Sequence, residues 1–166
     1  MQEYVKLLVE RVKKVKVGDP MDKDTFMGPL AREDLLDNIK SQMERGLKES
    51  GTELVYQGEA PKEGYFYPIT IVRVKKGSGS VFLKEEIFGP VMVLVESQSD
   101  LESIEIANDT EYGLSATIMT TNEERALLMG KRIDSGSVFV NRVSAPPSEL
   151  PCGGVKNSGY GRDCGR

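Results

Sequence analysis

Histidine is absent from this sequence of 166 residues, and cysteine occurs only twice, as Cys152 and Cys164. Imidazole is the general base of the common hydrolase triads and a frequent zinc ligand. The lack of histidine therefore argues against a hydrolase of this kind and against a zinc site built on histidine. Two cysteines near one end do not make a disulfide framework, and so few are typical of a reducing compartment. We therefore expect no bound metal and no structural disulfide.

Long apolar runs and an excess of basic residues are missing as well. No stretch approaches the roughly 18 apolar residues that a membrane span requires, and the first residues alternate charged with apolar side chains instead of forming a signal sequence. Lysine and arginine number 22 against 26 aspartates and glutamates, a net charge of -4, whereas nucleic-acid binding needs a dense basic face. We expect a cytoplasmic protein that contacts neither a membrane nor nucleic acid.

The residues that are present describe an ordinary globular chain. Hydrophobic residues make up 39% and charged residues 29%, and a chain of this length can bury a hydrophobic core, so we expect one domain over residues 1–166. Apolar side chains recur at helical spacing near the start, in a helix that Gly18 and Pro20 end, and again over residues 31–50, with Gly51 as a cap. The two apolar stripes are Val5, Leu8, Val9, Val12 and Val15, and Leu35, Leu36, Ile39, Met43 and Leu47.

Strands alternate with helices in the rest of the sequence. Strands are predicted at residues 53–56 and 68–74. Continuous apolar strands that then alternate with helices predict an α/β fold with a parallel-sheet βαβαβ core and covering helices, followed by a long ordered loop from residue 141. The segments of this core, strand and helix in turn, are 91–95, 100–108, 114–120, 122–133 and 137–141.

A charged turn stands directly before the first strand of that core. It places Glu85, Glu86 and Phe88 ahead of Gly89 and Pro90. A pair of carboxylates suits acid–base work, an ionised carboxylate also accepts hydrogen bonds from both hydroxyls of a ribose, and an aromatic ring packs beside a flat ligand. The alternative is a charged turn in solvent with Phe88 in the core.

A glycine-rich segment closes the chain, with four glycines among residues 153–161. Such a segment makes tight turns or approaches another surface closely. Taken alone it suggests a phosphate loop with Lys156 as the cation, but it matches neither the Walker A pattern nor GxGxxG after a strand. Cys152, just before it, has no histidine to activate it as a nucleophile, so we do not expect it to be catalytic.

Three segments, in this order and spacing, resemble successive signatures of the aldehyde dehydrogenase superfamily: EEIFGPV at 85–91, YGLSA at 112–116 and GGVKNSGYGR at 153–162. The similarity runs over essentially the whole chain, including residues 17–20 and 28–29. Within the superfamily, the chain most resembles succinate-semialdehyde dehydrogenases. The resemblance implies covalent catalysis, in which a cysteine attacks the aldehyde, NAD or NADP takes the hydride and the product is a carboxylic acid.

The resemblance implies cofactor contacts for two residues of the turn. Glu86 matches the glutamate that hydrogen-bonds the nicotinamide ribose, and Phe88 matches the aromatic residue beside the nicotinamide. The glycine-rich tail would be mainly structural. NAD and NADP are not distinguished, because the contacts that select the 2′ position belong to the dinucleotide-binding half.

The resemblance further implies that the loop of residues 141–152 lines the substrate entrance. Cys152 stands where members commonly carry an aromatic residue, and its smaller side chain would widen the pocket. Arg142 opens the loop, and its planar guanidinium suits a substrate carboxylate such as that of a semialdehyde acid. The alternatives for Arg142 are a solvated charge or a pair with Glu149.

These residues match only part of a family enzyme. The family's nucleophilic cysteine, its general-base glutamate and its dinucleotide-binding half lie upstream of the position of Met1, and an oligomerisation strand follows that of Arg166. We expect the isolated chain to be inactive, and the intact protein, with the missing N-terminal half, to be a homo-oligomer acting on a small-molecule aldehyde. The alternatives are a non-catalytic split or remnant module, and a relative that makes an acyl-CoA or reduces an acyl phosphate.

Overall fold

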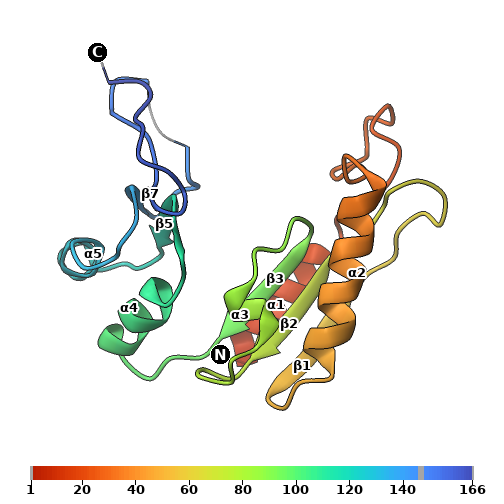
Figure 1. Ribbon diagram of the computed structural model, residues 1–166, viewed down its shortest axis with the longest axis horizontal. Coiled ribbons are helices and arrows are strands. Elements are labelled where there is room, and N and C mark those ends of the chain that lie inside the picture. The colour runs from red at the N-terminus through yellow and green to blue at the C-terminus, as the bar shows by residue number, and fades with distance from the viewer. Residues whose placement is uncertain (1, 146–147, 166) are drawn as a thin grey trace. The chain divides into compact units, whose positions relative to one another are not determined.

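The computed structural model describes residues 2–145 and 148–165, which fall into two compact units that meet in sequence at Glu96 and Ser97 (Figure 1). The first unit contains α1 (Gln2–Val12), α2 (Glu33–Leu47), β1 (Thr52–Gln57), β2 (Thr70–Val74), α3 (Val81–Lys84) and β3 (Val91–Val95). The second contains α4 (Asp100–Asn108), β4 (Tyr112–Gly113), β5 (Ser115–Ile118), α5 (Glu123–Gly130), β6 (Ser137–Val140) and β7 (Val155–Lys156).

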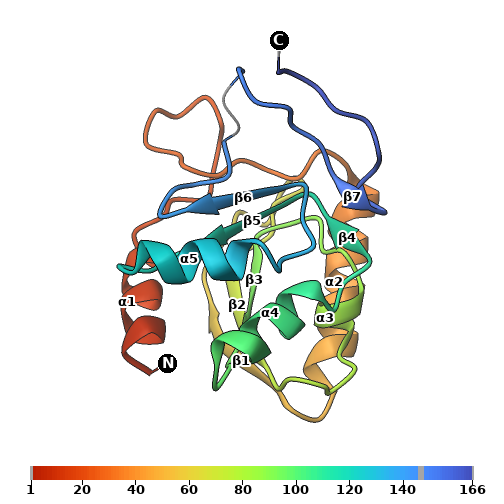
Figure 2. The same ribbon diagram turned by 90° about the vertical axis from the view of Figure 1, so that its left-hand side faces the viewer.

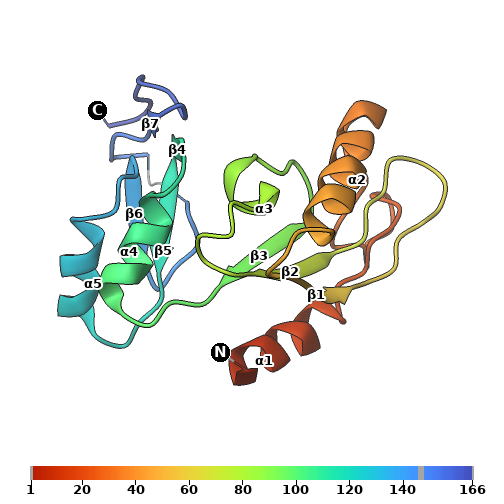
Figure 3. The ribbon, with the colours of Figure 1, turned by 60° about the horizontal axis from the view of Figure 1, so that its bottom comes forward.

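The first unit is built on a three-stranded sheet in the order β1-β2-β3. β1 runs antiparallel to β2, and β3 runs parallel to it. α1 covers one face of this sheet, whereas α2 and α3 cover the other (Figure 3). The central strand β2 is therefore buried on both sides, which explains the exposure of 0% at Ile71 and Val72.

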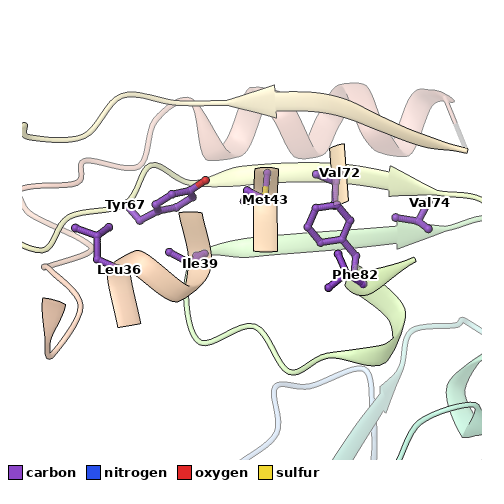
Figure 4. Close-up of a cluster of buried hydrophobic side chains, with 8 residues drawn as sticks. Leu36, Ile39, Met43, Tyr67, Val72, Val74 and Phe82 are labelled. Carbon is purple, nitrogen blue, oxygen red and sulfur yellow. The ribbon is translucent and has the colours of Figure 1, made fainter. Parts of the chain in front are cut away.

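The larger core of this unit lies between the sheet and the face of α2 and α3 (Figure 4). Gly46 allows the close approach of the two helices, because a Cβ at that position would lie 2.3 Å from the ring of Phe82. The buried members of this core are Leu36, Ile39, Met43, Tyr67, Val72, Val74, Val81 and Phe82. On the opposite face of the sheet, Val5 of α1 packs with Ile71 and Leu94.

The second unit contains two small sheets. β5 and β6 are parallel, and α5 runs alongside them (Figure 2); β4 pairs with β7 in an antiparallel ladder. The side chains of Ser99 and Asn122 cap the amino ends of α4 and α5. At the other end of α4, Asn108 donates to the carbonyl of Arg132 at 2.8 Å and accepts from the N–H of Asp134 at 2.8 Å. This one side chain therefore ties the end of α4 to the segment that enters β6.

The predicted α/β class is confirmed, and β3 and α4 have the predicted bounds. The sheet that contains β3 is mixed, since β1 is antiparallel, and β3 forms its described ladder with β2 while β5 and β6 make a sheet of their own. The prediction of one parallel sheet through β3, β5 and β6 was therefore wrong for the strand pairs that the structure describes. The short elements α3 and β7 were not predicted.

The first helix ends at Val12 and does not reach residue 15 as predicted. Beyond it the hydrogen bonds tighten, with the N–H of Val15 donating to the carbonyl of Val12. The carbonyl of Lys16 then accepts from the N–H groups of Phe26 and Met27 at 3.0 and 3.1 Å. The i→i−3 bond of Val15 replaces the i→i−4 bond of an α-helix, so α1 ends before residue 15. No described helix combines the length and the apolar character of a membrane span.

Candidate functional site

The turn between α3 and β3 carries the predicted cofactor contacts, and its start is fixed by the cap of α3. The buried Ser80 caps this helix, and both carboxylate oxygens of Glu49 lie 3.2 Å from the amide nitrogen of Val81. Carboxylates suit this place because free N–H groups point out of the amino end of a helix. The chain therefore enters the turn from a defined position.

Glu85 anchors the turn to α2. Its carboxylate accepts two hydrogen bonds of 2.7 Å from the guanidinium of Arg45 and a third, of 3.1 Å, from the amide of Gln42. The hydrogen bonds from Arg45 and then Gln42 lower the pKa of the Glu85 carboxyl to about 2. Glu85 is therefore ionised at neutral pH, and its hydrogen-bonding capacity is used within the protein.

The backbone of the turn is pressed against the same helix. Gln42 donates to the carbonyl oxygen of Glu86 at 3.0 Å. Gly89 lies so close to α2 that a Cβ there would be 2.4 Å from Cδ1 of Ile39. At the far end, the carbonyl of Pro90 accepts from the N–H of Thr70 at 2.9 Å and so joins the turn to β2. The backbone of the turn is therefore held at Glu86, Gly89 and Pro90.

Glu86 and Phe88 remain available on this fixed backbone. Glu86 is exposed, and among the described residues no side chain pairs with its carboxylate. Phe88 is 58% exposed, so the alternative that places this ring in the core is wrong. The structure thus presents an unpaired carboxylate and an accessible aromatic ring two positions apart, as a ribose and a nicotinamide ring would require.

Arg142 lies in the second unit, just after β6. One guanidinium nitrogen donates to the carbonyl of Ala145 at 3.3 Å, and the guanidinium lies 5.8 Å from the ring centre of Phe139. The preceding Asn141 has a φ of 53°, and its side chain bonds both the N–H and the carbonyl of Thr120. Arg142 is exposed, and within the described part of the chain no ion pair joins it to Glu149. Pro146 and Pro147 of the predicted entrance loop lie outside the described residues.

Cys152 lies at the other end of that loop and is partly buried as a free thiol. Its N–H and carbonyl form two hydrogen bonds of 2.8 Å with the carbonyl and N–H of Asp163. Cys164 is also free. The backbone of Cys152 is therefore held by the tail. Among the described residues, no hydrogen bond joins its side chain to Arg142, the other predicted pocket residue.

Lys156 is not placed to hold a phosphate. Its ammonium donates to the carbonyls of Asn108 and Thr110 at 3.0 and 3.1 Å and lies 4.0 Å from the carboxylate of Asp134. A cation at the carboxyl end of a helix also complements the helix dipole. Lys156 thus caps the carboxyl end of α4.

The glycines of the tail serve close packing. A Cβ on Gly136 would lie 1.7 Å from the carbonyl oxygen of Gly153, and one on Gly153 would lie 2.2 Å from that of Gly161. Arg162 donates to the carbonyl of Gly154 at 2.7 Å. These contacts support a structural role for the tail.

Two further observations bound the site. Over residues 2–145 and 148–165, no group of three or more acidic or cysteine side chains is arranged to hold a metal ion. A groove of about 570 Å³ lies between α4 and α5, and its lining includes Leu101, Ile104 and Leu128 but none of the predicted site residues.

The residues that sequence reasoning missed are Gln42 and Arg45. They lie 40 or more positions before the turn that they bind, so no local spacing indicates the contact. One signal was present: Gln42 falls between Ile39 and Met43, on the apolar face of the second helix. A polar residue in that stripe needs a buried partner.

Comparison with known proteins agrees with the geometry. The profile of the "Aldehyde dehydrogenase family" matches residues 1–166. The chain is 40% identical over 150 residues to succinate semialdehyde dehydrogenase [NAD(P)+] Sad of Escherichia coli (strain K12), covering 90% of this chain and 32% of that protein. It is 38% identical over 169 residues to betaine aldehyde dehydrogenase of Brucella anthropi, covering 99% of this chain and 34% of the relative.

A solved structure shows the same fold. The crystal structure of succinic semialdehyde dehydrogenase from Streptococcus pyogenes, in complex with NADP+ as the cofactor, superposes with a TM-score of 0.90 at 38% identity, over 98% of this chain and 36% of that one. The chain belongs to the aldehyde dehydrogenase family, which confirms the resemblance of its three signatures. It spans about a third of the length of these relatives.

Proposed function

We propose that this chain is the C-terminal part of the catalytic domain of an enzyme that oxidises an aldehyde to a carboxylic acid with NAD or NADP. The observation that carries the proposal is the turn of residues 85–90, where a clamped backbone leaves the carboxylate of Glu86 and the ring of Phe88 available. The two compact units would belong to one domain over residues 1–166. Relatives named as NAD(P)-dependent dehydrogenases support this cofactor class.

The residues of the turn suit the nicotinamide end of such a cofactor. An ionised carboxylate accepts hydrogen bonds from both hydroxyls of a ribose, and none of the described side chains competes for the carboxylate oxygens of Glu86. Phe88 exposes enough of its ring to pack beside the nicotinamide. When bound, the cofactor accepts the hydride of the aldehyde. Glu86 and Phe88 would orient it, and orientation is a large part of what a protein contributes to such a reaction.

The attacking thiol and the general base would come from the N-terminal part of the full-length enzyme. Cys152 is a poor candidate for the nucleophile, because the sequence has no histidine to activate it. We therefore expect no aldehyde oxidation by the isolated chain with NAD or NADP. Turnover above the no-enzyme control that Cys152→Ser abolishes would contradict this and make Cys152 catalytic. The intact enzyme would be cytoplasmic and homo-oligomeric.

We also propose that Arg142 and Cys152 belong to the substrate pocket, with a semialdehyde acid such as succinate semialdehyde as the substrate. Arg142 is exposed and uses one guanidinium nitrogen for the carbonyl of Ala145, so further donors are available to a carboxylate. The succinate semialdehyde dehydrogenases among the relatives support this class of substrate.

The proposed cofactor role is tested in the full-length protein by Glu86→Gln. The substitution keeps the shape of the side chain and removes the charge-assisted hydrogen bonds to the ribose, which are worth roughly 1.5 to 3 kcal/mol, or about ten- to a hundredfold in kcat/KM. Glu63→Gln is the matched control, because Glu63 is exposed in a loop of the same unit. A Glu86→Gln enzyme as fast as the control would show that this carboxylate does not bind the cofactor.

A further inference from the structure

One face of α2 follows the turn of residues 85–90 along its length. Arg45 binds Glu85, Gln42 binds both Glu85 and the backbone of Glu86, and Ile39 packs against Gly89. Positions three apart on a helix lie on one face, so these three side chains form one row of contacts. The row runs backwards along α2 as the turn runs forwards, from Arg45 to Ile39.

Gln42 is the centre of this row, and its amide has a single workable orientation. The residue is 2% exposed, and its Nε2 donates to Oε2 of Glu85 at 3.1 Å and to the carbonyl oxygen of Glu86 at 3.0 Å. Both partners are acceptors, so a flipped amide would set oxygen against oxygen. Its own Oε1 has no hydrogen-bond partner among the described residues. A buried amide kept with one unmatched oxygen indicates that its two donated bonds matter.

Arg45 pairs with Glu85 and leaves the neighbouring Glu86 available to a ligand. Its planar fork binds both oxygens of Glu85 at 2.7 Å and neutralises that carboxylate. Glu86, one position further, keeps its oxygens for a ligand. Since the side chains of Arg45 and Glu85 are 50% and 41% exposed, the pair adds little to the stability of the fold, so its main effect is on the geometry of the turn.

We propose that Gln42 and Arg45 are positioning residues of the cofactor site, which hold Glu85 and thereby fix where Glu86 and Phe88 meet the nicotinamide end of the dinucleotide. The proposal rests on the proposed function of the turn and adds the α2 residues that no local signature marks. The proposal gives the two glutamates different roles. Glu85 binds Arg45 and Gln42, and these contacts, here called the clamp, hold the turn. Glu86 binds the cofactor.

The experiment uses the full-length protein and measures binding, not turnover. NADH and NADPH are titrated into wild type, Arg45→Ala, Arg45→Lys and Gln42→Leu, with Lys48→Ala as the matched control, because Lys48 pairs with Glu44 on the same helix away from the turn. ADP and its 2′-phosphate, which lack both the nicotinamide and its ribose, are titrated in parallel. Fluorescence of the bound nicotinamide and amide exchange of residues 86–89 report on the turn itself.

A positioning role predicts a split between the two kinds of ligand. Arg45→Ala and Gln42→Leu should weaken the reduced cofactor that binds best by about tenfold and speed exchange at residues 86–89, with bound fluorescence moving toward that of the free cofactor. The affinity for ADP or its 2′-phosphate should stay within about twofold. Arg45→Lys, which keeps the charge without the fork, should give an intermediate loss of affinity for the reduced cofactor. A purely structural role would weaken both ligands equally.

The failure of the clamp differs from the failure of the proposed function. If Arg45→Ala and Gln42→Leu both match Lys48→Ala while Glu86→Gln still weakens the reduced cofactor, the clamp is wrong and the role of Glu86 stands. If Glu86→Gln has no effect either, both proposals are overturned. Because Arg45 is half exposed, its variants keep the test valid should Gln42→Leu fail to fold.

Discussion

The turn of residues 85–90 and the glycine-rich tail both attract attention as ligand-binding segments, and they use their polar side chains in opposite ways. In the tail, Lys156 and Arg162 donate hydrogen bonds to backbone carbonyls of the same unit. In the turn, the carboxylate of Glu85 binds Arg45, while that of Glu86 pairs with no side chain in the part of the protein that the structure describes. A charged residue near glycines is therefore a ligand candidate only when its hydrogen-bonding capacity is unused.

Binding of the cofactor by the tail would contradict this difference between the two segments most strongly. Lys156→Met in the full-length protein should lower the free energy of unfolding by about 2 kcal/mol, since two hydrogen bonds from a charged amine to the end of α4 are lost. The folded fraction should keep its kcat/KM for NAD or NADP. Urea denaturation and steady-state kinetics measure the two quantities. A loss of cofactor affinity with unchanged stability would place Lys156 at a ligand.

Arg142 tests whether the second unit also leaves a charged side chain available. Its substitution by alanine should lower the ratio of kcat/KM for an ω-carboxylated aldehyde to that for a neutral aldehyde of equal length by about tenfold, or about 1.4 kcal/mol. Lys131→Ala is a suitable control, since Lys131 is an exposed cation of the same unit. An unchanged ratio would show that Arg142 does not bind the substrate carboxylate.

The smallest expected effect is the pH dependence of stability that comes from Glu85. Its pKa is lowered from 4.5 to about 2 in the folded protein, so the folded state binds the proton more weakly than the unfolded chain. The stabilisation is complete above pH 4.5 and is lost as the pH falls through about 2. Between pH 5 and pH 3, wild type should therefore lose more stability than Glu85→Gln in urea denaturation. Equal losses would mean that the Arg45 pair does not persist in solution.

Local periodicity predicted the long elements well and the short ones poorly. The apolar run of β3 and the pattern of α4 defined their bounds, because each element satisfies its own hydrogen bonds or buries its own face. α3 has only four residues and β7 only two, too few for a period to appear. The end of α1 was misjudged because the N–H groups of residues 14 and 15 donate to carbonyls three positions back, a change that the apolar spacing does not reveal.

The same limit applies to the candidate site. The resemblance pointed to Glu86 and Phe88 from one short motif, but Gln42 and Arg45 act through contacts across more than 40 positions. Spacing alone favoured a core position for Phe88, and only its exposure of 58% removed that alternative. Long-range partners of a motif require the packing of α2 against the turn, which the sequence does not encode locally.

The most direct test of the account is a crystal structure of the full-length protein with NAD+ or NADP+ bound. The account predicts that carboxylate oxygens of Glu86 lie within hydrogen-bonding distance, about 2.6 to 3.0 Å, of the hydroxyls of the nicotinamide ribose. Phe88 should pack beside the nicotinamide ring, while Glu85 stays on Arg45. A nicotinamide ribose bound away from Glu86, or a Glu85 that leaves Arg45 to bind it, would contradict the central claim.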